Sequence, residues 1–191
     1  MLHTDFHPFP ELYTERLTLR HMSNEDADDL FLIRSDKDAM QYIDRPLATT
    51  VDDVLKLLKT IEDFLVAGDG ITWGISLTGQ PGLIGTIGLW RIVKEDYRAE
   101  IGYLLHPAWQ RKGIMHEALV KVLDYGFSVM KLHSVEAKLN PLNEASIRLL
   151  EKNRFVREAY FKENYYYNGA FKDTLIYSLL TPYPNLPPIN L

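Results

Sequence analysis

The chain has 191 residues, of which 46% are hydrophobic, 12% aromatic and 25% charged. These proportions are those of one globular domain with a core of its own, and they exclude disordered, collagen-like and membrane-spanning classes. The chain carries 26 Asp and Glu against 21 Lys and Arg, and the resulting net charge of −5 argues against nucleic acid as the main partner.

Cysteine is absent from the chain. Its absence excludes disulfides, cysteine-ligated metal centres and a cysteine nucleophile. No basic segment followed by an apolar run opens the sequence, and no apolar run approaches the roughly 18 residues of a membrane span. We therefore expect a soluble cytoplasmic protein without membrane contact, whose chemistry uses oxygen, nitrogen or a cofactor.

The N-terminal part of the chain predicts one strand and two helices. Apolar and polar residues alternate from Thr14 to Met22, as in a half-buried strand. Ser23 has the character of an N-cap, and an apolar stripe at helical spacing follows it. Thr50 opens a second helix, which we expect to end at Gly68 in the left-handed conformation.

The rest of the chain alternates strands with two more helices. Strand patterns cover Ile71–Thr78, Leu83–Val93, Ala99–Leu105 and His133–Leu139, and helical spacing covers Gly113–Met130 and Asn143–Asn153. Two further extended stretches follow Phe155 and are joined at Asn168-Gly169, which is typical of a type I′ hairpin turn. We expect the tail from Thr181, which holds four prolines, to be irregular.

These elements predict an α/β (α+β) fold in a single domain. We expect a mixed, mostly antiparallel central sheet of about seven strands flanked by about four helices. Residues 1–13 would form an N-terminal extension, residues 14–180 the domain, and residues 181–191 a Pro-rich tail.

The segment between the strand at Ala99–Leu105 and the helix that starts at Gly113 carries the clearest chemistry. Backbone N–H groups from Gln110 to Gly113, together with the start of the helix, lack intrahelical partners, and the helix dipole adds positive charge there. Arg111 and Lys112 add fixed charge, and Gly113 allows close approach, so the loop is suited to a pyrophosphate. Alternatively, Gly113 only eases a tight turn and the two cations are solvated.

Gln110-Arg-Lys-Gly-Ile-Met115 resembles the Q/R-x-x-G-x-G/A acetyl-CoA motif of the GNAT superfamily of acyl-CoA N-acyltransferases. Further stretches resemble, in order, its RimJ/RimL-like branch, named for ribosomal-protein-alanine N-acetyltransferases: Thr14–Arg20, Leu83–Gly88, Glu100–Tyr103, Asn143–Lys152 and Asp173 with Tyr177–Leu180. The resemblance implies the GNAT fold and acetyl-CoA as cosubstrate, with no metal. Its binding residues would be Gln110, Arg111, Lys112, Gly113, Ile114 and Met115.

The resemblance also implies that the strand at Ala99–Leu105 separates from its neighbour after Tyr103. Backbone groups around Leu104 and Leu105 would then pair with the pantetheine arm, and one N–H would polarise the acetyl carbonyl. Met115 replaces the second glycine of the motif, which leaves the backbone N–H groups intact if its side chain faces the core. Asn153 replaces the usual glycine after the following helix, and we expect it to adopt the left-handed conformation.

Glu100 is the candidate general base. An α-amino group with a pKa of about 8 must lose its proton before it attacks the thioester, and Glu100 begins the strand that leads into the loop. Alternatively, Glu100 is an exposed charge at a strand end.

Asn143 and Ser146 lie one helical turn apart and share a face. The resemblance implies that Asn143 holds the cofactor arm and that Ser146 returns a proton to the departing thiolate. Many superfamily members use a Tyr at the position of Leu150, which leaves Ser146 or water as the acid here. Alternatively, Asn143 is only the N-cap of its helix.

Two other groups of residues have weaker assignments. His3 and His7 have the spacing of metal ligands on a helix, but the adjacent Pro8 opposes a helix there and no carboxylates accompany the pair. We therefore expect no metal site. The aromatic residues from Phe161 to Phe171 either line an acceptor pocket, form the surface of a homodimer, or pair across a hairpin.

The sequence therefore predicts an acetyl-CoA-dependent N-acetyltransferase that acts on a primary amine, with a protein N-terminus as the suggested acceptor. Because the chain has no cysteine, transfer would be direct rather than through an acetyl-cysteine. The alternatives are an enzyme for small amines such as polyamines, amino acids or aminoglycosides, and a CoA-binding module without catalysis. A nucleotide-binding protein is disfavoured, since neither a Walker lysine nor a Rossmann acidic partner is present.

Overall fold

The computed structural model describes residues 2–183 and contains one eight-stranded sheet in the order β1-β2-β3-β4-β5-β6-β8-β7. All neighbouring strands are antiparallel except β5 and β6, which run parallel. The strands are β1 (Leu12–Tyr13), β2 (Leu17–Arg20), β3 (Ile71–Leu77), β4 (Leu83–Val93), β5 (Arg98–Leu105), β6 (Ser134–Leu139), β7 (Val156–Tyr167) and β8 (Ala170–Leu180).

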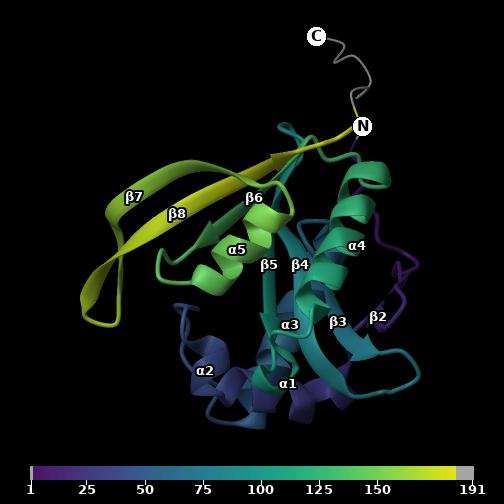
Figure 1. Cartoon of the computed structure of the whole chain (residues 1–191). Helices are drawn as coiled ribbons and strands as arrows, with labels where there is room; N and C mark the ends of the chain where they lie inside the picture. Colours follow the sequence, from purple (N-terminus) through teal and green to yellow (C-terminus); the bar gives the residue numbers. More distant parts are fainter. Residues whose placement is uncertain (1, 184–191) are drawn as a thin grey trace.

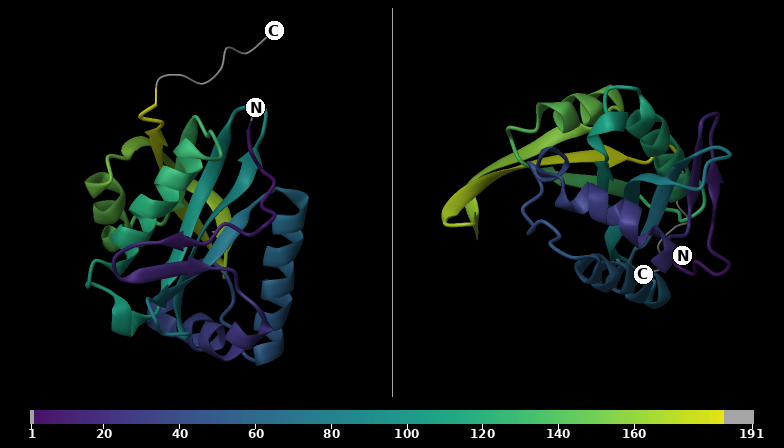
Figure 2. Two further views of the ribbon diagram at one scale, coloured as in Figure 1. Left: turned by 90° about the vertical axis from the view of Figure 1, so that its right-hand side faces the viewer. Right: turned by 90° about the horizontal axis from the view of Figure 1, so that it is seen from below.

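Five α-helices accompany the sheet in the part of the chain described. They are α1 (Ala27–Ser35), α2 (Lys37–Met40), α3 (Val51–Ala67), α4 (Ile114–Ser128) and α5 (Glu144–Lys152), with 3-10 turns at Asn24–Asp26 and Pro107–Trp109. Helices α4 and α5 lie on one face of the sheet and α3 on the other, while the β7–β8 hairpin extends away from the body (Figures 1 and 2). None of the helices described is long and apolar enough to span a membrane.

The main core lies between the sheet and α4. The buried face of α4 includes Ala118, Leu119 and Val122, which recur at helical spacing and pack against strand residues such as Trp73 and Ile87. A second cluster joins α1, α2 and α3 around Leu30. The sheet is therefore covered by helices on both faces, as expected for the predicted fold class, which is confirmed.

The structure adds two short elements to those expected from the sequence. The additional strand is β1, with two residues, and the additional helix is α2, with four. Elements this short leave no periodic pattern in a sequence. The segment expected as an N-terminal extension lies against the domain, because Phe6 is buried and the Trp73 indole donates to the Pro10 carbonyl at 2.7 Å. The part of the tail at residues 184–191 lies outside the described residues.

Three local predictions are confirmed by backbone geometry. Thr50 forms a capping box at the start of α3, and Gly68 ends that helix at φ +67°. Asn168 and Gly169 both have positive φ, at +49° and +82°, as a type I′ turn requires.

The prediction that Asn153 is left-handed is wrong. Asn153 has φ −93°, and the left-handed residue is the next one, Arg154, at φ +66°. The Phe155 N–H bonds to the Leu150 carbonyl and the Arg154 N–H to the Glu151 carbonyl, which is the Schellman pattern with Arg154 just past the helix end. Asn153 is instead the C-cap of α5, and its side-chain amide donates to the Leu149 carbonyl at 2.7 Å.

Candidate active site

The loop between β5 and α4 presents a row of backbone donors. Gly113 precedes the helix in the left-handed conformation at φ +75°, and Arg111 is also left-handed at φ +59°. The first helical bond runs from the Glu117 N–H to the Gly113 carbonyl at 3.1 Å. Within residues 2–183, no backbone or side-chain acceptor contacts the N–H groups of residues 111–116. This arrangement forms an anion-binding concavity.

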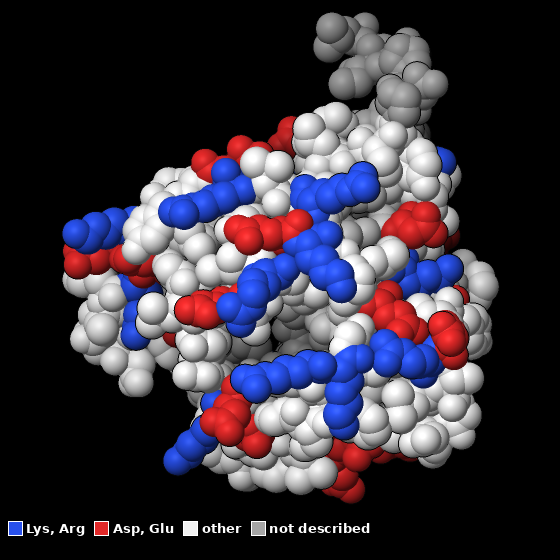
Figure 3. All heavy atoms as spheres, in the orientation of Figure 1, with Lys and Arg blue, Asp and Glu red and all other residues white. Residues whose placement is uncertain are grey.

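Charge and exposure in the loop also suit a pyrophosphate. Gln110, Arg111, Lys112 and Gly113 are all exposed, and the Lys112 Nζ lies 4.8 Å from the centre of the Trp109 ring. Lys and Arg side chains gather around a hollow between α5 and the α1–α2 segment (Figure 3). The left-handed backbone conformation of Arg111 destabilises the folded state by about 1 kcal/mol. Residues strained in this way are concentrated at functional sites.

The two hydrophobic residues of the motif lie under the loop. Ile114 is buried and Met115 packs against the main core, so neither side chain fills the concavity. The Gln110 side chain turns back and donates to the Leu105 carbonyl at 3.2 Å, which ties the loop to the end of β5. The predicted residues from Gln110 to Met115 thus fit a CoA pyrophosphate through their backbone.

The separation of β5 and β6 begins earlier than predicted. The two strands pair only from Arg98 with Ser134 to Glu100 with Glu136, so they part after Glu100 and not after Tyr103. Beyond that point β5 continues to follow β4, and β6 follows β8 as far as Leu139. Each strand is held by its other neighbour, and a gap opens between them.

Of the two leucines predicted to meet the pantetheine arm, Leu105 has its backbone on the gap side. The His106 N–H bonds to the Ile84 carbonyl at the β4 edge, and backbone groups alternate along a strand, so those of Leu105 face the opposite edge. By the same alternation, those of Leu104 face β4. Both side chains are buried, and Leu104 belongs to the second core cluster.

Glu100 lies where the gap begins, with a side chain only 11% exposed. Its carboxylate pairs with the Arg91 Nη1 at 2.9 Å and the Lys138 Nζ at 3.4 Å, and Lys138 also reaches Glu136 at 3.1 Å. Arg91 reaches it through a bulge in β4, where Arg91 takes φ +47°. Bulges of this kind re-aim side chains beside functional sites. Glu100 is therefore a paired carboxylate rather than a free strand-end charge.

Asn143 and Ser146 lie at the start of α5. The Asn143 Oδ1 accepts the Ser146 N–H at 3.1 Å, so Asn143 is the N-cap of the helix, and its amide NH₂ is left for another partner. Burial raises the pKa of Tyr103 to about 12, against the opposing effect of a hydrogen bond with the Ser146 side chain. Tyr103 therefore remains protonated at neutral pH beside Ser146, across the gap from α5 to β5.

Sequence reasoning missed three residues around this site. Arg91 and Lys138 flank Glu100, and Tyr103 adjoins Ser146. Tyr103 was within a motif but had no role assigned to it. Nothing in the local sequence reveals the bulge at Arg91, because its register depends on the partner strand.

The other candidates lie apart from this constellation. No group of three metal-binding side chains occurs among residues 2–183. Tyr166 and Phe171 pair across the β7–β8 hairpin with ring centres 5.2 Å apart, and both are exposed. The Tyr165 hydroxyl bonds to Asp44, which joins the hairpin to the segment after α2.

A mostly antiparallel sheet with one parallel pair that parts beside a loop of backbone N–H donors is the arrangement that the sequence predicted for an acyl-CoA N-acyltransferase. The family model described as the acetyltransferase (GNAT) domain matches residues 16–156. The chain belongs to this family, which confirms the predicted family and acetyl-CoA as cosubstrate.

Several known proteins are similar over most of the chain. The uncharacterized N-acetyltransferase YoaA of Bacillus subtilis is 35% identical over 174 residues, which cover 91% of this chain and 98% of the relative. The crystal structure of a GNAT-family acetyltransferase from Bacillus anthracis superposes with a TM-score of 0.80 at 29% identity, covering 90% of this chain and 98% of that one.

Two relatives bear names that state an acceptor. The [ribosomal protein uS5]-alanine N-acetyltransferase of Escherichia coli is 29% identical over 126 residues, 65% of each chain. The spermidine N(1)-acetyltransferase of Vibrio cholerae is 26% identical over 177 residues, which cover 89% of this chain and 96% of the relative. The chain is thus an N-acetyltransferase of a family that acts on both protein and small-molecule amines.

Proposed function

We propose that the protein acetylates the α-amino group of a peptide or protein N-terminus by direct attack on acetyl-CoA in a ternary complex. The observation that carries the proposal is the position of Glu100, a nearly buried carboxylate at the point where β5 and β6 part. The loop at residues 110–115 holds the pyrophosphate, and the gap beside Leu105 receives the pantetheine arm. The amine then reaches the thioester from the side of Glu100.

The ion pairs of Glu100 bear on the identity of the acceptor. Arg91 and Lys138 already contact the carboxylate, so an incoming ammonium would have to compete with two resident cations. An α-amino group with a pKa of about 8 is roughly one-tenth free base at pH 7, whereas an amine with a pKa near 10.4 is almost entirely protonated. This difference favours an α-amine, in agreement with the relative named for ribosomal protein uS5-alanine.

Glu100 acts as proton acceptor during attack rather than before it. When the amine nitrogen bonds to the acetyl carbonyl, its proton becomes strongly acidic and passes to the carboxylate, directly or through water. The intermediate then expels the CoA thiolate. A Leu105 N–H directed into the gap is placed to stabilise the negative oxygen.

Ser146 supplies the proton that the thiolate takes. Its hydroxyl lies beside the Tyr103 hydroxyl, which passes a proton to Ser146 as Ser146 gives one up and then regains one from water, while Glu100 returns its proton to water. Asn143, fixed as the N-cap of α5, directs its amide NH₂ toward the cofactor arm. Neither step needs a covalent enzyme intermediate, in accord with the absence of cysteine.

A panel of amines tests the acceptor. Peptides that begin with Ala or Ser, spermidine, amino acids and an aminoglycoside are incubated with acetyl-CoA, and CoA release is followed. We expect the peptides to have the highest kcat/KM. Preferred turnover of spermidine would refute the N-terminal assignment. If the protein binds CoA but acetylates no amine, the enzymatic proposal is refuted and the protein is a CoA-binding module.

The proposal includes a homodimer through the β7–β8 hairpin. Phe161, Tyr166 and Phe171 are each at least half exposed along this projecting arm, and aromatic residues are enriched at protein interfaces. Sedimentation of the wild-type protein and of a Tyr166→Ser, Phe171→Ser variant tests it. A monomeric wild-type protein would refute it.

A further inference from the structure

The N-terminal Thr14-Glu-Arg-Leu motif carries an arginine whose side chain contacts the first turn of α4 and the loop before it. Arg16 follows β1 and precedes β2, far from α4 in sequence. Its Nε donates to the Glu117 Oε2 at 2.7 Å, its Nη2 lies 2.6 Å from the same oxygen, and its Nη1 donates to the Lys112 carbonyl at 3.1 Å. One side chain therefore holds both the first turn of α4 and the loop before it.

Glu117 is the centre of this arrangement. Its Oε1 accepts bonds from the Thr14 hydroxyl at 2.5 Å and the Arg16 N–H at 3.0 Å, while Oε2 faces the Arg16 guanidinium. Burial alone would raise the pKa of Glu117, but the bonds from Thr14 and Arg16 outweigh it and lower the pKa. The carboxylate is therefore charged at neutral pH, and both of its oxygens are bonded to Thr14 or Arg16.

The contacts reach the left-handed part of the loop directly. A Cβ built at Gly113 would lie 3.4 Å from the Arg16 Nη2, so the guanidinium lies against the residue that ends the loop. The Lys112 carbonyl bonded to Arg16 belongs to the peptide group that also carries the Gly113 N–H. Holding that carbonyl outward points the N–H into the concavity, since the two groups of a trans peptide are antiparallel.

We infer that Arg16 and Glu117 are positioning residues for acetyl-CoA, which hold the N–H groups of residues 111–116 in their binding geometry. The clamp is built from the Thr14-Glu-Arg-Leu motif, so this N-terminal stretch supports the cofactor site. A loop that is competent only one-tenth of the time binds about tenfold more weakly, which sets the scale of the expected effect.

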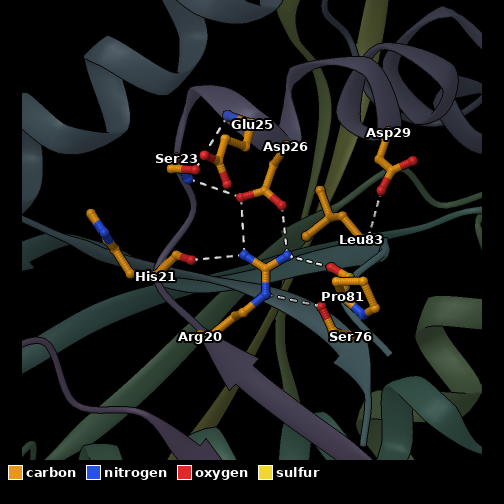
Figure 4. A network of polar contacts seen from close by, with 9 residues as sticks. All are labelled: Arg20, His21, Ser23, Glu25, Asp26, Asp29, Ser76, Pro81 and Leu83. Atoms are coloured by element: carbon orange, nitrogen blue, oxygen red, sulfur yellow. Dashed lines mark hydrogen bonds and ion pairs between the residues drawn. The ribbon is translucent and has the colours of Figure 1, made fainter. Parts of the chain in front are cut away.

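The test compares Arg16 with Arg20, the other arginine of the same stretch. Arg20 also grips a carboxylate, with its two terminal nitrogens 2.9 and 2.6 Å from Asp26, and it further bonds Ser76 and the Pro81 carbonyl (Figure 4). None of its partners belongs to the pyrophosphate loop. Arg20→Lys is therefore a matched control for the loss of a bidentate ion pair.

Calorimetric titration with CoA measures the effect without any acceptor. We expect Arg16→Ala and Glu117→Gln each to raise the Kd for CoA about tenfold. The double variant should raise the Kd little further, because each single substitution already breaks the same Arg16–Glu117 interaction. Arg20→Lys should leave the Kd within about twofold while lowering the Tm. An unchanged Kd in folded Arg16→Ala, or an equal loss in Arg20→Lys, would overturn the inference.

Hydrogen exchange supplies the readout that separates positioning from general stability. In Arg16→Ala without ligand, the Glu117 N–H, which bonds to the Gly113 carbonyl, should exchange faster, while β3 and β4 keep their protection. Uniformly faster exchange over the whole domain would refute a local role.

Discussion

Substitution of Gly113 by Ala is the most direct test of the pyrophosphate loop. Gly113 has φ +75°, a conformation that costs a residue with a Cβ about 1–2 kcal/mol. The nearest atom to the new Cβ is the flexible Arg16 Nη2 at 3.4 Å, so no collision adds to this cost. The strain must appear either in folding stability or in cofactor binding.

Whether folding stability or CoA binding is affected depends on the conformation of the loop in the ligand-free protein. If the loop relaxes to negative φ without ligand, the Tm is unchanged and CoA binding must restore the strained form, so the Kd rises about 5- to 30-fold. If the clamp from Arg16 prevents relaxation, the Tm falls and the Kd changes little. In both cases the summed loss should be about 1–2 kcal/mol.

Gly169→Ala is the matched control. Gly169 has φ +82° at the tip of the β7–β8 hairpin with nothing within 4 Å of a new Cβ, so the substitution carries the same intrinsic cost. It should reduce stability alone and leave the Kd for CoA unchanged. A Gly113→Ala protein with wild-type Tm and wild-type Kd would refute the assignment of the loop.

Three further predictions concern catalysis and pH. Glu100→Gln should lower kcat/KM by about 10²- to 10⁴-fold with the Kd for CoA unchanged, and undiminished kcat/KM would remove Glu100 as proton acceptor. Ser146→Ala should lower kcat and leave CoA binding intact. An unchanged kcat would mean that water, and not Ser146, protonates the CoA thiolate. The pKa of Asp26 is lowered because bonds from Arg20 and Ser23 outweigh its burial, and hydrogen bonds to Thr49 and Thr50 lower that of Asp53 to about 2. A carboxyl with a lowered pKa stabilises the fold above its unfolded pKa, so the Tm should fall as the pH drops from about 4.5 toward 2. A Tm that stays constant over that range would contradict this assignment.

The local structure of this protein was predictable because its signals are local. The capping box at Thr50, the left-handed Gly68 and the Asn168-Gly169 turn each depend on a few neighbouring residues. The end of α5 shows the limit of such signals. Asn153 is a good left-handed residue, yet its amide contacts the Leu149 carbonyl and the His116 Nδ1, the latter at 3.1 Å, and it keeps a negative φ while Arg154 takes the left-handed position.

The candidate site was predictable only in part. The loop from Gln110 to Met115 is contiguous in sequence, so its character as an anion site follows from residue types and helix geometry. The residues around Glu100 come from β4 and β6, and they meet only because those strands flank β5 in the sheet. The distance from Arg91 to Glu100 further depends on a bulge.

The sequence by itself determined the fold class, the candidate loop for the cofactor and the exclusion of cysteine chemistry. These follow from hydrophobic periodicity, from a helix start and from composition, all of which are properties of the chain. Only the tertiary structure decided where β5 and β6 part, which cations hold Glu100, and that Arg16 clamps Glu117 across 101 residues of chain. Those are competitions between strands and side chains distant in sequence, and packing alone settles them.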